Sequence, residues 1–193
     1  MQVLGALDQI SPTGSRTPMA GVNLTITVDD AAVRTALGAL IAKVGKPAAA
    51  LRDIGEYLLL ATDRRFRAQA APDGTPWAPN SDVTLLRHLN RGGKGFKKNG
   101  SLSARGAKRL GSKRILRDSG LLQGSIRYQL EAGGAAVAIG TNRIYGAMQQ
   151  FGGTRAQWPH LWGDIPARRF LGLAAADREE IRAILRRHLN RTP

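Results

Sequence analysis

A single stripe of apolar residues marks the longest predicted element of this chain. Leu51, Ile54, Leu58 and Phe66 recur at the three- and four-residue spacing of one buried helix face. The stripe follows a Gly-Lys-Pro break, and proline is favoured in the first turn of a helix. We therefore predict a long helix over residues 47–70.

Similar spacing predicts two further helices, over residues 31–44 and 174–189. Asp29 or Asp30 stands where the first of these needs an N-terminal cap. In the second, carboxylates precede arginines along the helix, which is the order that the helix dipole prefers.

Alternation of apolar and polar residues predicts strands. Residues 125–130 and 136–139 flank a Gly-Gly turn and predict a β-hairpin with one buried face. Residues 24–28 alternate in the same way and predict another short strand. A helical segment around Ala147 follows the hairpin and is expected to stop at Gly152-Gly153.

These elements predict an α+β fold with helices packed on a small antiparallel β-sheet. Residues 1–21 are rich in Gly, Ser, Thr and Pro and lack a periodic apolar pattern, so we interpret them as a flexible N-terminal arm. The length of 193 residues fits a single domain, which we place at residues 22–193.

Composition adds a strong positive charge to this picture. The chain has 29 Lys and Arg against 14 Asp and Glu, a net charge of +15, which predicts contact with nucleic acid or an acidic protein surface. Cysteine is absent, which excludes disulfides and thiolate metal sites. No apolar run approaches the roughly 20 residues that span a bilayer, so no membrane partner is expected.

Much of the charge lies in residues 83–117, which contain no Asp or Glu. Lysines and arginines accumulate there among six glycines. Like charge and glycine at this density disfavour a packed element, so we predict a long, mobile basic loop, inserted in the domain, that becomes ordered only against an acidic partner. The predicted contact residues are Arg87, Arg91, Lys94, Lys97, Lys98, Arg105, Lys108, Arg109, Lys113, Arg114 and Arg117.

A solvated loop without a partner is the plainest alternative, but uncompensated charge costs self-repulsion that an inert loop could avoid. Two functional interpretations remain. Residues 87–117 contact the phosphate backbone of a nucleic acid, or they dock on an acidic protein. Phe96 is the only Phe, Tyr or Trp in this stretch, which disfavours single-strand binding.

Candidate catalytic residues do not form a recognisable set. The histidines have no other histidine or carboxylate at metal-ligand spacing, and three aspartates that a fold could gather have no histidine or paired glutamate nearby. We therefore expect no enzyme activity, no metal and no cofactor. The residues considered are His88, His160, His188, Asp63, Asp73 and Asp82.

From residue 73 onward the chain carries an ordered series of short motifs. They are Asp73-Gly74-Thr75-Pro76-Trp77-Ala78-Pro79, Ile115-Leu116-Arg117-Asp118-Ser119-Gly120-Leu121-Leu122 with Ser125-Ile126, Ile139-Gly140-Thr141, Tyr145 with Gln150-Phe151-Gly152-Gly153, and Ile165-Pro166-Ala167-Arg168 with Phe170-Leu171-Gly172. This series resembles the phage virion morphogenesis family, also called tail completion proteins, of Mu-like and related tailed bacteriophages. The resemblance covers about residues 26–189. Gln149 and Arg169 stand where the family tends to have histidine and proline.

The resemblance implies an α+β structural subunit of a ring, expected to be a hexamer, at the head–tail neck or the upper tail end of a virion assembled in the bacterial cytoplasm. The implied partners are other copies of the chain, neighbouring neck, connector or tail tube proteins, and genomic DNA in the channel. A nucleic-acid-binding module that uses residues 87–117 is the alternative function. Motif residues expected to have structural roles are Trp77, Gly120, Leu121, Tyr145, Phe151, Gly152, Pro166, Arg168 and Phe170.

Overall fold

The computed structural model describes residues 47–191 except Gly92, Ala132, Gly133, Ala135 and Trp162, together with Ala31, Thr35, Gly38, Ala39 and Ala42. The predicted arm 1–21 and strand 24–28 lie outside the described residues. The five described positions of the predicted helix 31–44 are all helical, and the rest of that helix also lies outside them.

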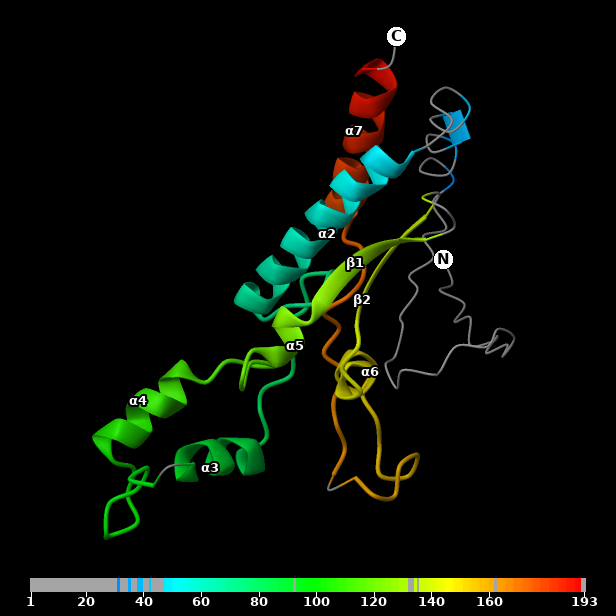
Figure 1. Cartoon of the computed structure of the whole chain (residues 1–193). Helices are drawn as coiled ribbons and strands as arrows, with labels where there is room; N and C mark the ends of the chain where they lie inside the picture. The colour runs from blue at the N-terminus through cyan, green and yellow to red at the C-terminus, as the bar shows by residue number, and fades with distance from the viewer. Residues whose placement is uncertain are drawn as a thin grey trace.

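Helices and one antiparallel hairpin make up the described part of the chain (Figure 1). The predicted α+β class is therefore confirmed. In chain order the elements are α2 (Ala48–Ala68), α3 (Asp82–Asn90), α4 (Ala104–Ser112), α5 (Leu121–Gly124), β1 (Ile126–Glu131), β2 (Ala136–Thr141), α6 (Tyr145–Phe151) and α7 (Ala175–Arg191).

Helix α2 is the centre of the packing. It contacts both strands of the hairpin and also α7. Its predicted stripe, Leu51, Ile54, Leu58 and Phe66, is buried. At the C-terminal end of α2 the ring of Phe66 lies 5.2 Å from that of Trp77 and 5.5 Å from that of Phe170. These aromatic contacts bury enough apolar surface to join the end of α2 to two segments far away in the sequence.

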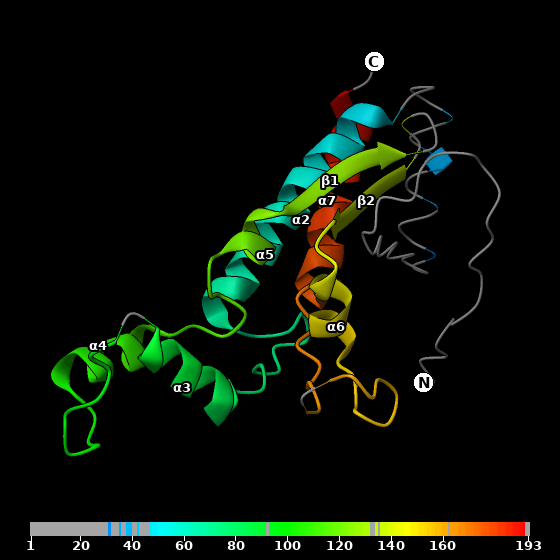
Figure 2. The ribbon, with the colours of Figure 1, turned by 60° about the horizontal axis from the view of Figure 1, so that its bottom comes forward.

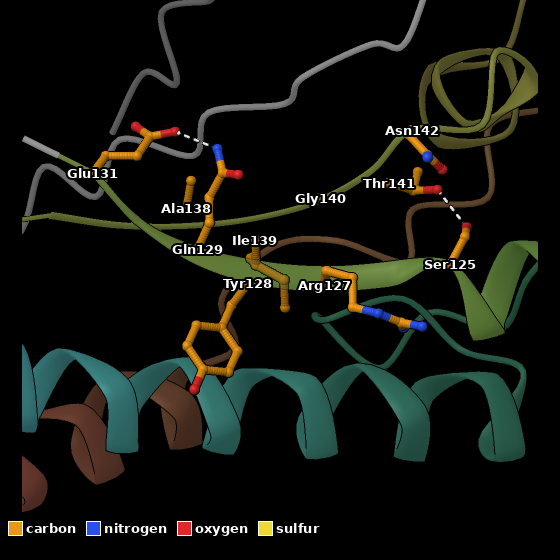
Figure 3. A pocket seen from close by; sticks show the side chains of 10 residues that line it. All are labelled: Ser125, Arg127, Tyr128, Gln129, Glu131, Ala138, Ile139, Gly140, Thr141 and Asn142. Atoms are coloured by element: carbon orange, nitrogen blue, oxygen red, sulfur yellow. Dashed lines mark hydrogen bonds between the residues drawn. The ribbon is translucent and has the colours of Figure 1, made fainter. Parts of the chain in front are cut away.

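The hairpin lies on α2 through Tyr128, which pairs with Ile139 across the two strands. Figure 3 shows the Tyr128 side chain turned toward the helix, with Gln129 and Ala138 on the other side of the sheet. The ring covers Gly55, where any Cβ atom would overlap it. A glycine inside a helix costs roughly 1 kcal/mol of helix propensity. Here its absent side chain makes room for the ring.

A buried ion pair connects α2 to α7. The Arg65 guanidinium donates hydrogen bonds to Asp177 and to the carbonyl of Phe170, and the Tyr57 hydroxyl donates to the same aspartate at 2.9 Å. Burial is the main cause that lowers the pKa of Arg65, and burial followed by the bond to Asp177 raises the pKa of Tyr57. Arg65 lies in the last turn of α2, where a cation complements the helix dipole, and its side chain also holds two helices together.

The prediction that no packed element forms in residues 83–117 is wrong. Helices α3 and α4 pack on each other and extend away from α2, α7 and the hairpin (Figures 1 and 2). We call residues 81–118 the basic arm. Ser81 and Ser103 cap its helices, because their side chains accept hydrogen bonds from the backbone N–H groups of Thr84 and Gly106.

Candidate functional site

The extended segment 165–172 is itself one of the sequence motifs and joins two others, the Tyr145–Gly153 motif and the Asp73–Pro79 motif. Its connection to α6 is made by Gln150, a buried residue. The Gln150 side chain accepts the backbone N–H groups of Phe170 and Leu171 at 2.9 and 3.0 Å and donates to the Leu171 carbonyl at 2.9 Å. One amide thus satisfies three buried backbone groups that no sheet partner satisfies.

Arg168 connects the same segment to the Asp73–Pro79 motif. Its guanidinium donates to the carbonyls of Ala78 and Pro79 at 2.8 and 2.7 Å, and its backbone N–H donates to the Gln149 carbonyl at 2.8 Å. Burial lowers the pKa of Arg168. This cation is held by backbone carbonyls and positions chain segments, which is a structural role.

The remaining motif residues divide into a buried group and an exposed group. Trp77 is buried and donates its indole N–H to the Arg169 carbonyl at 2.9 Å, and Phe170 is fully buried. Gly120 and Gly152 have positive φ angles of 78° and 74°, which favour glycine. Leu121, Tyr145, Phe151 and Pro166 are exposed instead.

Helix α6 buries one face and exposes apolar residues on the other. Gly146 and Gln150, one turn apart, face the core. Ile144 and Phe151, two turns apart, lie on the opposite face with 73% and 60% of their surfaces exposed. Sequence reasoning missed Ile144, although apolar residues at positions that cannot share one helix face were the available signal.

A groove of about 490 Å³ runs beside this helix. Its lining includes Tyr145, Ile165 and Pro166, and also Ser81, Thr84 and Asp118. The groove therefore brings together motif segments and the start of the basic arm. None of its lining groups forms an acid and base pair suited to catalysis.

A second hollow, of about 210 Å³, follows the hairpin (Figure 3). Several of its polar side chains already have local partners. Arg127 donates to the carbonyls of Gly124 and Ile126, and Gln129 donates to Glu131 at 3.0 Å. The hollow is thus a feature of the sheet surface without a reactive group.

The basic arm is fastened by Arg109. From α4 this guanidinium donates to the carbonyls of Leu89 and His88 at 3.1 and 2.7 Å, and also to that of Arg91. The last carbonyls of a helix have no partner within it, and they carry the negative end of its dipole. Arg109 donates hydrogen bonds to these carbonyls at the end of α3, and its positive charge lies at the negative end of the dipole.

Close backbone contact also shapes the arm. A Cβ atom on Gly106 would overlap the Gly95 carbonyl, and one on Gly95 would lie 2.5 Å from the Leu89 carbonyl. Leu89 is buried beneath these contacts. Two of the glycines that indicated a mobile loop are therefore the points where segments touch.

Asp118 ties the arm to its own base. It accepts hydrogen bonds from Lys113 at 2.5 Å and Arg91 at 2.8 Å. These bonds, that of Lys113 first, lower the pKa of Asp118 to about 2. The structure thus gives three predicted contact residues, Arg91, Arg109 and Lys113, structural partners within the arm.

Seven other predicted contact residues are exposed and form no ion pair with a carboxylate in the part of the chain that the structure describes. They spread over the turn between the helices, α4 and the segment after it, and Arg87 is exposed on α3. The seven are Lys94, Lys97, Lys98, Arg105, Lys108, Arg114 and Arg117.

The aspartates considered for catalysis are not brought together. Asp63 pairs with Arg67, and Asp73 pairs with Arg169, both at 2.6 Å, while Asp82 lies in the first turn of α3. Within the described residues no group of three or more His, Cys, Asp or Glu could hold a metal ion. Nor is any helix there long and apolar enough to cross a membrane.

Comparison with protein families gives one match. The model of the phage virion morphogenesis family matches residues 28–105 and 93–190, which together cover most of the chain. The chain belongs to this family. A role in the structure and assembly of the bacteriophage virion follows for this family member. Comparisons with curated proteins and with solved structures return no significant match.

Proposed function

We propose that this virion morphogenesis family member is the subunit of a homo-oligomeric ring at the head–tail neck or the upper tail end of a tailed phage, expected to be Mu-like. Six is the expected number of subunits. Neighbouring neck, connector or tail tube proteins would stack on the two ends of the ring.

The outward face of α6 is the observation that supports this proposal best. Ile144 and Phe151 are apolar, largely exposed and borne on a helix that Gln150 fixes from the other side. Several large apolar side chains exposed on one face mark a protein interface more often than a single exposed side chain does. A closed ring covers such a face on every subunit because each copy meets its neighbour in the same way.

The groove beside α6 supplies the complementary surface. It adjoins Tyr145 and Pro166, which are exposed motif residues, and it is large enough to receive an apolar side chain from a neighbour. A contact that joins two different patches in head-to-tail fashion generates a ring when the rotation closes.

Sedimentation analysis of variants tests the proposal. Ile144→Ser combined with Phe151→Ser should turn a ring into monomers while the far-ultraviolet circular dichroism stays unchanged. Leu60→Ser is the matched control because Leu60 is 59% exposed on α2, and this variant should keep the ring. An assembled double variant, or loss of assembly in the Leu60 control alone, would contradict the proposed interface.

A further inference from the structure

The basic arm concentrates the charge of the whole protein. Residues 81–118 contain eleven lysines and arginines and two aspartates, so nine of the fifteen net positive charges of the chain lie there. Asp118 is already engaged by Arg91 and Lys113. Seven exposed cations form no ion pair with a carboxylate among the described residues, so their charge is left to solvent or to a partner; they are Lys94, Lys97, Lys98, Arg105, Lys108, Arg114 and Arg117.

Two adjoining hollows collect part of this charge. The first, of about 410 Å³, is lined by Arg105, Lys108, Arg109, Ser112 and Gly93. Its side chains are cations and a hydroxyl, all able to donate hydrogen bonds, and none is apolar.

The second hollow, of about 290 Å³, shares Ser112 with the first and adds Arg114, Arg117, Lys113, His88 and Asp118. The two hollows meet at Ser112, and their cations lie along the end of α4 and the segment after it; we call this row of cations the cationic track. An extended track of separate cations suits a polyanion with regularly spaced charges better than one small anion.

We propose that the basic arm binds the phosphate backbone of duplex nucleic acid, with Arg105, Lys108, Arg114 and Arg117 contacting phosphates. Arg109 and Lys113 lie at the same hollows but are held by the arm itself, so they position the contacting side chains. Contacts of this kind go to phosphate oxygens and are independent of base sequence.

The lining of the track favours a nucleic acid over an acidic protein. Protein interfaces place aromatic or apolar anchors at their centres, and neither hollow contains one. Single-stranded nucleic acid needs aromatic side chains on which bases stack, and the hollows lack these too. A duplex carries its phosphates on the outside and stacks its bases inside, so contact with its backbone needs neither feature.

The inference stands on the chemistry of the arm and does not require a ring. A protein that remained monomeric would still bind duplex DNA through this track. Failure of the proposed assembly and failure of nucleic-acid binding are therefore separate outcomes.

Fluorescence anisotropy of the full chain with a labelled 20-base-pair duplex, titrated at several salt concentrations, tests the proposal. Each phosphate contact contributes about 0.9 to the slope of log affinity against log salt. Arg105→Gln, Lys108→Gln, Arg114→Gln and Arg117→Gln combined should lower that slope by about three to four. Four such contacts weaken binding about a hundredfold when the salt concentration rises from roughly 50 to 200 mM, and the variant should lose this part of the salt dependence.

A control with the same loss of charge separates the track from net charge. Arg52→Gln, Arg155→Gln, Arg178→Gln and Arg186→Gln change four exposed cations outside the arm and should leave most of the slope intact. Equal slopes for the two quadruple variants would overturn the proposal. So would poly-glutamate binding as tightly as the duplex at the same salt, since the track would then fit an acidic protein. A thermal unfolding midpoint equal to that of the wild type confirms that each variant is folded.

Discussion

Gln150 and Phe170 are joined by a hydrogen bond of 2.9 Å from a buried backbone N–H to a buried side-chain oxygen. Phe170 in turn accepts a bond from Arg65 through its carbonyl. The segment that contains Phe170 thus meets both α6 and α2. A short helix with an exposed apolar face is thereby anchored to the core, and this relationship underlies the proposed assembly surface.

Replacing Gln150 with leucine should lower the free energy of unfolding by about 2–4 kcal/mol. The change leaves two N–H groups and one carbonyl buried without partners, and each such group costs about 1–3 kcal/mol, with partial relaxation. Urea titration measures the loss. Gln129→Ala, at an exposed position of β1, should change the stability by less than about 0.5 kcal/mol. Similar values for the two variants would contradict the role of Gln150.

Gly106→Ala should disrupt the basic arm without unfolding the core. The new methyl group would overlap the Gly95 carbonyl, which belongs to the backbone and cannot rotate away. Amide exchange in α3 and α4 should accelerate while that in α2 stays slow. Gly111→Ala is the control in the same helix because no atom beyond its chain neighbours and the nearby backbone of α4 lies within 4 Å of its Cβ position. That variant should gain up to about 1 kcal/mol of helix propensity. Slow exchange in the arm of Gly106→Ala would argue against close packing there.

Arg109→Lys should weaken α3 almost as much as Arg109→Gln. One ammonium group cannot reproduce a fork that reaches the carbonyls of His88, Leu89 and Arg91. Hydrogen bonds to charged groups contribute about 1.5–3 kcal/mol, so protection of α3 amides should fall by at least about tenfold. Arg105→Gln, an exposed neighbour on α4, serves as the control and should leave exchange unchanged. Full rescue by lysine would mean that charge alone acts at this site.

Acid should loosen the base of the arm between about pH 4 and pH 2. The folded-state pKa of Asp118, about 2, lies below its ordinary value of 3.8 because Lys113 and Arg91 donate hydrogen bonds to the carboxylate. A depressed pKa stabilises the fold above the unfolded-state value, and this contribution is lost as the pH falls through the folded-state value. Amide exchange around Lys113 should therefore rise across this window in the wild type. In Asp118→Asn it should already be fast at neutral pH and lack the transition, and a transition that persists would belong to another group.

Local periodicity was enough to predict α2, the hairpin and α7. In each of these elements the buried residues recur with one period along the sequence. Leu51 and Ile54 are an example, because both belong to the same core. The same reasoning failed for α3 and α4, where packing depends on partners distant in sequence. Arg109 finds carbonyl groups that lie 18 to 21 residues away, and Gly106 meets Gly95 across a turn. The number of charged residues and glycines in a stretch does not predict which residues contact each other.

The candidate site was predictable only in part. The motif series pointed to Trp77 and Phe170, whose packing the structure describes, but the series could not separate buried motif residues from exposed ones. Exposure of Phe151 and Ile144 follows from the direction of Gln150, which is fixed by backbone groups 20 residues later in the chain. In the basic arm, likewise, only the three-dimensional contacts distinguish the cations that hold the arm together from those that are exposed.

Native mass spectrometry of the purified wild-type chain tests the central claim most directly. A ring subunit should appear as one dominant species whose mass is an integer multiple, six by expectation, of the 20.7 kDa chain. Its top view in electron micrographs should show a central opening. A single species of 20.7 kDa at every concentration, with no assembly in the presence of phage neck or tail proteins, would contradict the account.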